Sequence, residues 1–266
     1  MKKIYLITLL SICSISLFSS SKPQETELFM FISKHNVQYD EIEPYLTFKN
    51  HLKKNDFFDL EPLRLQKDYS HIETMNHYHY NQIKPAPFFN TNLILVNKQF
   101  YLNKDFIPSN LIVIPDTLNH ANDNIMIQTL VLTQYSNMVS DLKLDDLYLF
   151  SGYRDYYKQE ALYRYYQDDN YSAKPGFSEH QTGLAVDISR KDIGLTSLFK
   201  DTYEYQVLIK NCFKYGFILR YPENKQNHTG YYYEPWHFRY VGKIHAKYIM
   251  NNNLTLEEYL YANFEF

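Results

Sequence analysis

Short apolar runs alternate, from about residue 92 onward, with longer stretches whose apolar positions recur every three or four residues. The runs LILVN at 93–97 and LIVIP at 111–115 are apolar and β-branched, which is typical of strands. Residues 122–143 place Ile127, Leu130 and other apolar side chains at helical spacing, and this predicts a long helix.

The same mixture continues to the end of the chain. The other expected elements are strands at 147–154, 183–188, 217–222 and 236–242, and helices at 155–168, at 201–215 and within 243–263. Gly216 follows the helix 201–215, where it would serve as a C-terminal cap. Because the order lacks the regular βαβ alternation of a parallel sheet, the sequence favours an α+β fold.

The first 21 residues differ in kind from the rest. Lys2 and Lys3 precede the uncharged run IYLITLLSICSISLF, and three serines follow it. A basic start, a short apolar run and a small-residue exit predict a signal peptide, with an uncleaved N-terminal membrane anchor as the alternative. We therefore expect the protein to be extracytoplasmic, either secreted or tethered to the membrane.

Residues 22–88 are charged and aromatic, contain few glycines and are expected to form a mainly helical segment of unknown role. Pro85 and Pro87 predict a boundary, after which residues 89–266 form the main domain. The motif HYHY at 77–80 could place two histidines on one strand face. With no third ligand nearby, packing is favoured over metal binding there.

Composition narrows the picture only slightly. A chain of 266 residues with 45% hydrophobic and 21% charged residues is typical of a folded protein, and a net charge of −3 gives no reason to expect a nucleic-acid partner. If the leader is removed, Cys13 goes with it and Cys212 has no cysteine to pair with. Cys212 lies in an apolar run and is expected to be buried and structural.

The stretch SEHQTGLAVDIS at 178–189 contains the first candidate chemistry. If GLAVDI is a strand, Gly183, Ala185 and Asp187 share one face, which is nearly empty until it reaches the carboxylate. That space would let a metal and its substrate approach, and His180 could turn back toward Asp187. Taken alone, however, Asp187 could equally face solvent at a strand end.

The motif EPWHFR at 234–239 adds Glu234 and His237. Positions three apart on a regular strand face opposite ways, but Pro235 between them makes the backbone irregular, so both can reach one site. His180, Asp187 and His237 would supply two imidazoles and one carboxylate, a set that suits tetrahedral zinc with water as fourth ligand. Glu234 is then the candidate general base for that water. The helical HExxH motif is absent.

At these residues the chain resembles the VanY-type D-alanyl-D-alanine carboxypeptidases, zinc enzymes of the cell wall. SGYRDYYKQEALY at 151–163 and KYGFILRYP at 214–222 match the same family in the expected order, so the resemblance runs from about 92 to 262. It implies a small antiparallel sheet that is flanked by helices and cradles the zinc. The resemblance implies these roles: zinc ligands His180, Asp187 and His237, catalytic Glu234, and substrate-binding Arg154, Gln159 and Ser178.

Arg154 also fits this chemistry on physical grounds, because a guanidinium binds a terminal carboxylate through two parallel hydrogen bonds. For Ser178, contact with substrate, orientation of the site and a plain loop role stay open. Arg220 and Tyr221 could line the cleft or pack at the edge of the core. His228 is not expected to be a ligand, because a fourth protein ligand would displace the catalytic water.

The loop PENKQNHTG at 222–230 departs from the family, whose members more often place a glycine before the lysine. Asn224 stands there instead, and asparagine tolerates the left-handed backbone that the turn would need.

The function that we expect is a zinc carboxypeptidase that removes the terminal D-alanine from peptidoglycan stem peptides. The alternatives are an L,D-carboxypeptidase or a D,D-dipeptidase on related wall peptides, or a non-catalytic wall-binding protein. We expect a monomer at the bacterial cell wall whose only membrane contact would be an uncleaved N-terminal anchor.

Overall fold

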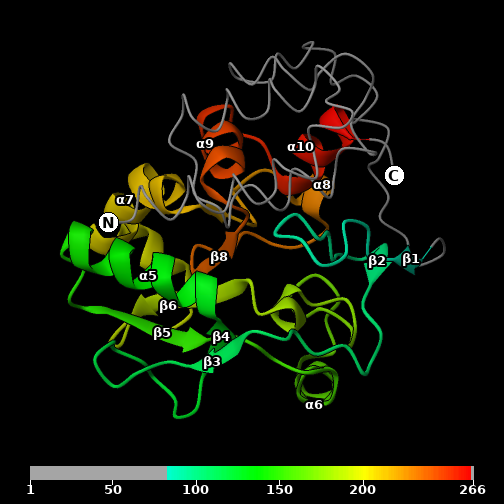
Figure 1. Cartoon of the computed structure of the whole chain (residues 1–266), viewed down its shortest axis with the longest axis horizontal. Helices are drawn as coiled ribbons and strands as arrows, with labels where there is room; N and C mark the ends of the chain where they lie inside the picture. The colour runs from blue at the N-terminus through cyan, green and yellow to red at the C-terminus, as the bar shows by residue number, and fades with distance from the viewer. Residues whose placement is uncertain (1–82, 265–266) are drawn as a thin grey trace, which may run out of the picture.

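The computed structural model describes residues 83–264, drawn in colour in Figure 1. The predicted leader at 1–21, nearly all of the segment 22–88 and the HYHY motif at 77–80 lie outside the described residues. Within 83–264, no helix has the length and apolar character needed to cross a membrane.

The described chain mixes short strands with helices, as the sequence predicts. In chain order the elements are β1 Lys84–Pro85, β2 Phe100–Tyr101, β3 Leu111–Val113, β4 Met126–Gln128, α5 Thr129–Leu142, β5 Leu147–Ser151, α6 Tyr156–Tyr166, η2 Glu179–Thr182, β6 Ala185–Arg190, η3 Ser197–Asp201, α7 Tyr203–Asn211, η4 Cys212–Tyr215, β7 Phe217–Leu219, α8 Gln226–Thr229, β8 His237–Tyr240, α9 Lys243–Asn251 and α10 Leu256–Asn263.

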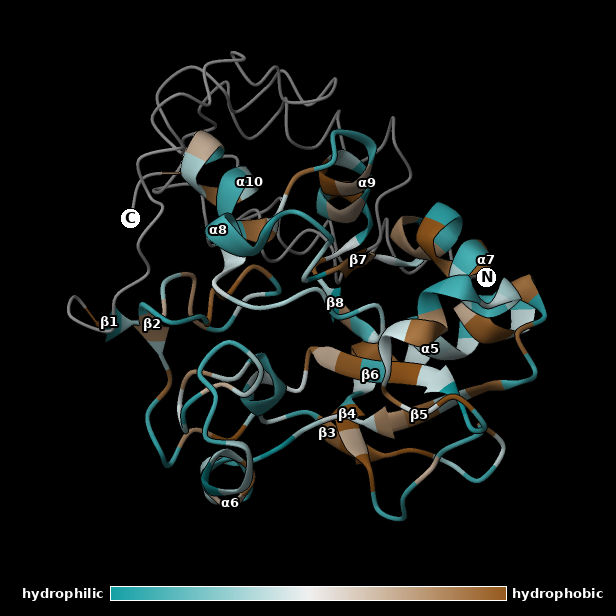
Figure 2. Cartoon of the chain, turned by 180° about the vertical axis from the view of Figure 1, so that it is seen from behind, coloured by the Kyte–Doolittle hydropathy of each residue, from teal (hydrophilic) through white to brown (hydrophobic). Residues whose placement is uncertain are grey.

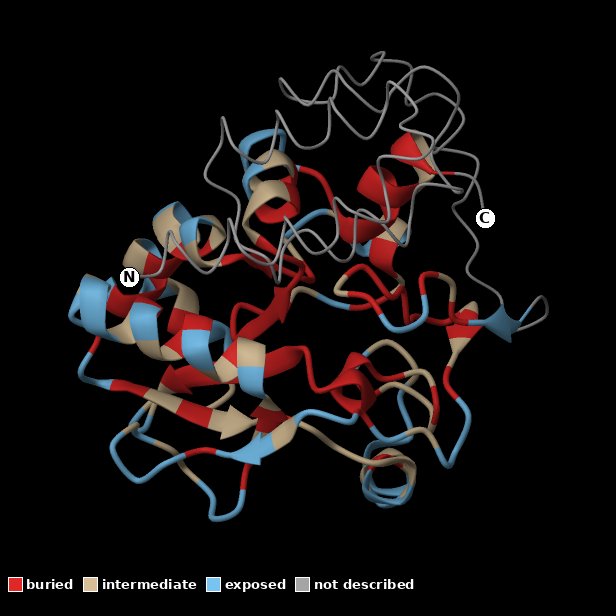
Figure 3. Cartoon of the chain, viewed as in Figure 1, coloured by how far each residue is buried: buried red, intermediate tan, exposed pale blue. Residues whose placement is uncertain are grey.

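The centre of the fold is a four-stranded antiparallel sheet in the order β5-β6-β8-β7. Helix α7 packs against β6, α9 against β7 and η4, and α5 against η4, so helices flank the sheet (Figure 1). All four residues of β8, and all of β6 except Arg190, are buried, and both strands are red in Figure 3. Hydrophobic residues dominate β5 and β6 in Figure 2. The inner strands therefore form the part of the molecule that is most shielded from water.

Two smaller strand pairs complete the domain. β3 and β4 pair antiparallel, and the backbone N–H of Gln128 donates to the carbonyl of Gly183 at 3.1 Å, which ties this ribbon to the turn before β6. β1 pairs with β2 in parallel, and Ala86 and Phe88 are buried in the core. The folded domain therefore already includes residues before the boundary that Pro85 and Pro87 predict.

The strand expected at 93–97 does not form. These residues are buried, but as a loop. The Leu95 N–H donates to the Pro87 carbonyl at 3.3 Å, and Arg239 Nη2 donates to the carbonyls of Asn92 at 3.0 Å and Ile94 at 2.8 Å. Apolar runs of this length signal burial, and burial here comes without strand pairing. The strand prediction was wrong because it took a signal of burial for a signal of strand pairing.

The helix expected at 122–143 is shorter. Met126–Gln128 form strand β4, in which Ile127 pairs with Ile112, and α5 begins only at Thr129. The apolar pattern of strand β4 overlaps the helical pattern of α5 at Ile127, a position that fits both, so the sequence did not separate the two elements.

The other predicted elements are confirmed. Helix α6 begins at the N-cap Asp155, whose side chain accepts a hydrogen bond from the Lys158 N–H at 2.7 Å. The region 201–215 is helical as α7 and η4 and ends at Gly216, where φ is 87°. A Cβ atom there would lie 2.5 Å from the Tyr240 ring, so only glycine fits. The C-terminal region contains two helices, α9 and α10, and Cys212 is fully buried as expected.

Candidate active site

The three predicted ligand residues come from two strands and the turn before one of them. Asp187 on β6 lies directly opposite His237 on β8 in the antiparallel ladder. His180 lies in the short 3₁₀ turn η2, whose N-cap is Ser178: the Ser178 Oγ accepts a hydrogen bond from the His180 N–H at 3.4 Å. Gly183 ends this turn with a φ of 68° and leads the chain into β6. The turn thereby brings His180 back to Asp187.

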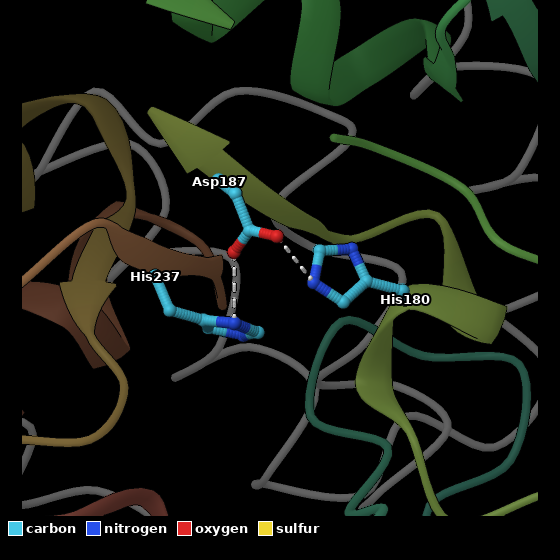
Figure 4. A group of neighbouring side chains, drawn as sticks. All are labelled: His180, Asp187 and His237. Atoms are coloured by element: carbon cyan, nitrogen blue, oxygen red, sulfur yellow. Dashed lines mark ion pairs between the residues drawn. The ribbon is translucent and has the colours of Figure 1, made fainter. Parts of the chain in front are cut away.

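The three side chains converge on one point, as Figure 4 shows, with the Asp187 carboxylate between the two imidazoles. His180 Nε2 lies 3.1 Å from Asp187 Oδ2, and His237 Nδ1 lies 3.1 Å from Asp187 Oδ1. One nitrogen or oxygen atom from each residue lies within 4.8 Å of the other two, and all three residues are buried. The other nitrogen of His180, Nδ1, contacts the carbonyl oxygen of Gly152 at 2.6 Å. This is a donor set that can hold a metal ion.

Glu234 reaches the same point from the turn before β8. The His237 N–H donates to the Glu234 carbonyl at 3.2 Å, and Glu234 Oε2 lies 3.5 Å from His237 Nδ1. The turn through Pro235 therefore lets residues three apart face one site, as the sequence suggested.

Burial and neighbouring charge set the protonation of these groups in the metal-free protein. Burial raises the pKa of Glu234 to about 8, because water no longer solvates the carboxylate. Burial opposes the positive charge of His237, but the adjacent carboxylates of Asp187 and Glu179 outweigh it and raise the pKa of His237 to about 9. Burial would raise the pKa of Asp187, yet the two histidines hold it well below its usual range. Burial lowers the pKa of His180.

The predicted substrate residues line the same cleft. Arg154 is half-buried beside it, and its Nε makes no hydrogen bond within residues 83–264. Gln159 donates through Nε2 to the Ala173 carbonyl at 2.6 Å, while its buried Oε1 has no partner within the same range. Ser178 lines the cleft and also caps η2, so it helps to orient His180.

The explanation that the sequence suggested for Gly183 and Ala185 was wrong. Gly183 is not part of the strand; its positive φ ends η2, and a Cβ atom there would lie 2.9 Å from Leu111 Cδ2 in β3. Ala185 is buried opposite Arg239 and is not among the residues that line the cleft. The small size of Gly183 therefore serves the turn and its packing against β3, and Ala185 packs within the buried sheet.

Tyr221 lines the cleft and lies beside His237, with ring centroids 4.7 Å apart and ring planes tilted by 49°. Arg220 points the other way and is fully buried in ion pairs. His228 lies on α8, with Nδ1 3.5 Å from a carboxylate oxygen of Glu258. Asn224 adopts the left-handed conformation expected of it, with a φ of 65°.

Sequence reasoning missed most of the aromatic lining. Tyr166, Tyr171, Tyr231 and Trp236 all line the cleft. No local signal separates these tyrosines from the others in a chain that contains 27 of them. It also missed Glu179, which lies inside the quoted motif and whose Oε2 is 3.6 Å from His237 Nε2.

The chain is similar in sequence to known peptidases. Residues 124–243 match the family model "VanY: D-alanyl-D-alanine carboxypeptidase". The bifunctional D-Ala-D-Ala dipeptidase and D-Ala-D-Ala carboxypeptidase VanXYC of Enterococcus gallinarum is 38% identical over 179 residues, which cover 63% of this chain and 92% of that protein. The chain belongs to the VanY family. YodJ of Bacillus subtilis (strain 168) is 42% identical over 185 residues, covering 63% of this chain and 66% of YodJ.

Solved structures of related peptidases match the fold of this chain. The LD-carboxypeptidase LdcB matches with a TM-score of 0.59 and 38% identity, over 68% of this chain and 94% of LdcB. A D,D-pentapeptidase VanY, from a VanB-type resistance cassette and solved in complex with Zn(II), matches with a TM-score of 0.50 and 32% identity, over 63% of this chain and 98% of that one. The mixed helix-and-sheet fold is therefore shared with peptidases of this family.

The raised pKa values of His237 and Glu234 predict how the stability of the metal-free protein depends on pH. The folded state binds protons on His237 and Glu234 more tightly than the unfolded state does, because both pKa values are raised, to about 9 and about 8. The free energy of unfolding should therefore fall as pH rises from 6.5 to 9, by about 3 kcal/mol for a shift of this size in His237. Urea unfolding in the presence of a chelator measures it. Glu234→Gln should make this fall shallower between pH 6.5 and 8, and a wild-type free energy of unfolding that rises between pH 6.5 and 9 would contradict the assignment.

Proposed function

We propose that this chain is an extracytoplasmic zinc-dependent carboxypeptidase that removes the terminal D-alanine from peptidoglycan stem peptides. The observation that carries the proposal is the convergence of His180, Asp187, His237 and Glu234 in a cleft that also holds the guanidinium of Arg154. Relatives named for D-Ala-D-Ala dipeptidase and carboxypeptidase activity support the substrate class.

The residues fit a zinc ion. Two imidazole nitrogens and one carboxylate oxygen are ligands that zinc takes in catalytic sites. They lie within 4.8 Å of one another, and the buried Asp187 Oδ1 has no hydrogen bond within residues 83–264. We infer that His180 Nε2, His237 Nδ1 and Asp187 hold the ion, which the related VanY structure also binds. When bound, zinc lowers the pKa of water and polarises the scissile carbonyl.

Glu234 is the group that moves the proton. Its carboxylate lies beside the ligands without being needed as one, with Oε2 3.5 Å from His237 Nδ1, so it is placed to act as a general base. Its Oε2 takes a proton from the attacking water and delivers it to the leaving amine. One carboxylate can serve first as the base and then as the acid, because it holds the proton between the two steps.

Arg154 and Gln159 bind the peptide in this proposal. The Arg154 guanidinium holds the terminal carboxylate through two hydrogen bonds, which makes a free C-terminus a requirement. The buried Gln159 Oε1, which has no partner within residues 83–264, accepts a hydrogen bond from a peptide N–H, since a buried acceptor without a partner is costly. Ser178 lines the cleft beside them, while its cap keeps His180 in place.

A second candidate is an L,D-carboxypeptidase, which the similarity to LdcB favours. A D,D-dipeptidase is the alternative that the similarity to VanXYC favours. All three activities use the same metal, base and guanidinium, so they differ only in which bond the cleft presents to them. We further propose that the protein acts as a monomer at the cell wall, secreted or held by its N-terminal leader.

Digestion of defined muropeptides tests the proposal. Tri-, tetra- and pentapeptide stems are incubated with the full chain, and the products are weighed by mass spectrometry. Loss of one alanine from the pentapeptide identifies the D,D-carboxypeptidase, and loss of one alanine from the tetrapeptide identifies the L,D-carboxypeptidase. Hydrolysis of free D-Ala-D-Ala, supplied as a separate substrate, into two alanines identifies the D,D-dipeptidase. A chelator should stop the reaction and added Zn²⁺ should restore it; no cleavage of any stem with zinc present would leave the wall-binding alternative.

Glu234→Gln tests the proton transfer. The amide keeps the size of the side chain but cannot take a proton, so kcat should fall by roughly 10²- to 10⁴-fold. Zinc content, measured by atomic emission, should remain one per chain. Activity near that of the wild type in this variant would refute the role of Glu234.

Arg154→Lys tests the recognition of the carboxylate. A lysine keeps the charge but loses the paired hydrogen bonds, so KM should rise by roughly 10- to 100-fold, with a smaller effect on kcat. Arg164→Lys on the exposed side of α6 is the matched control and should leave both constants unchanged. If Arg154→Lys discriminated against a C-terminally amidated peptide as strongly as the wild type does, another residue would have to bind the carboxylate.

A further inference from the structure

The two ring nitrogens of His237 face different groups. Nδ1 faces the site, 3.1 Å from Asp187 Oδ1 and 3.5 Å from Glu234 Oε2. Nε2 faces away from the cleft, toward Glu179 Oε2 at 3.6 Å. Both Nε2 and this Oε2 are buried, and neither has a hydrogen-bond partner within residues 83–264. A donor and an acceptor, both buried and otherwise unsatisfied, therefore face each other just beyond hydrogen-bond distance.

Glu179 is held rigidly from its other side. Its Oε1 accepts hydrogen bonds from Arg220 Nε at 2.7 Å and from Arg239 Nη1 at 2.8 Å, and all three side chains are fully buried. Two guanidinium groups thus fix one oxygen, which leaves the other directed at the ring of His237. A buried carboxylate with two cationic partners has little freedom to turn away, because each partner would lose its own hydrogen bond.

We propose that Glu179 is a positioning residue whose Oε2 accepts a hydrogen bond from the Nε2–H of His237 and so turns the Nδ1 lone pair toward the metal. A neutral imidazole carries one N–H, and the group that accepts from one nitrogen decides that the other is free to bind a cation. The inference rests on the proposed metal site. It gives a role to Glu179, a residue that would contact neither the metal nor the substrate.

His180 is oriented in the same way, by an acceptor at one ring nitrogen, but with the roles of Nδ1 and Nε2 exchanged. Its Nδ1 is 2.6 Å from the Gly152 carbonyl, an acceptor only, so Nδ1 carries the hydrogen and Nε2 faces Asp187. A backbone carbonyl fixes one imidazole and a carboxylate fixes the other. Carboxylate partners of this kind orient ligand histidines and raise their basicity.

The chain supplies a matched control on the far side of Arg220. Glu257 on α10 accepts from Arg220 Nη1 at 2.8 Å and Nη2 at 2.6 Å, and from Asn97 Nδ2 at 3.1 Å. Like Glu179, it is buried and paired with Arg220, but no contact joins it to His237 within the described residues. Removing its charge disturbs the buried ion pairs without touching the ring.

The test compares Glu179→Gln with Glu257→Gln in the full chain, using zinc itself as the probe. Glutamine has one oxygen instead of two, so it cannot accept from both arginines and from His237. We expect Glu179→Gln to raise the zinc dissociation constant, measured by chelator competition, by roughly 10- to 100-fold. Glu257→Gln should lower the thermal stability of the metal-free protein while changing zinc affinity by about twofold or less. An equal loss of affinity in both variants, or none in Glu179→Gln, would overturn the proposal.

A measurement on the wild type does not depend on the variants folding. Long-range ¹H–¹⁵N correlation spectra of the histidine rings in the zinc-loaded protein distinguish a ring protonated at Nε2 from one protonated at Nδ1. The expected result for His237 is a protonated Nε2, and the expected result for His180 is a protonated Nδ1. A His237 ring protonated at Nδ1 would refute the role of Glu179. A wild type that binds no zinc would instead contradict the proposed function, so the two failures are distinguishable.

Discussion

The pairing of β6 with β8 places Asp187 opposite His237, and the rest of the site depends on this register. In an antiparallel ladder, a slip of one residue turns every side chain to the other face of the sheet, so the carboxylate and the imidazole would part. Both strands are buried, and the apolar residues that alternate with the site residues, Val186, Ile188 and Phe238, are fully buried. Loss of that burial would cost more than any shifted pairing could recover, which holds the register.

Behind this pair lies a group of buried charges that has to be satisfied as a whole. Arg220 and Arg239 share Oε1 of Glu179, and Glu257 closes the second side of Arg220. Burial raises the pKa of Glu179, but the two arginine charges outweigh it and hold that pKa well below its usual range. The same arginines tie distant segments together, because Arg239 also donates to the backbone at Ile94 and Arg220 to helix α10. The wall behind the site is thus polar and rigid, whereas the cleft in front carries groups whose partners a substrate would supply.

That contrast suggests how one cleft combines tight positioning with recognition. His180 is hydrogen-bonded from outside the cleft by the Gly152 carbonyl, and His237 Nε2 faces Glu179 Oε2 at 3.6 Å, the contact that we propose to fix its ring. Arg154 Nε and Gln159 Oε1 lack such partners within residues 83–264. Groups that must not move face a partner within the protein, and groups that bind a peptide keep hydrogen-bonding capacity for the substrate.

Local sequence patterns were enough to predict the α+β class, most elements after residue 100, and the grouping of His180, Asp187, Glu234 and His237 in one site. They could do so because strand and helix periodicity is local, and because the motifs that carry these residues are short. The packed fold was needed to show that the apolar run 93–97 is a buried loop, and that Gly183 ends a turn instead of clearing a strand face. Glu179, Arg220 and Arg239 meet across 41 and 60 positions of sequence, as the hydrogen bonds show. Contacts of that range depend on how the strands pair, which no local pattern encodes.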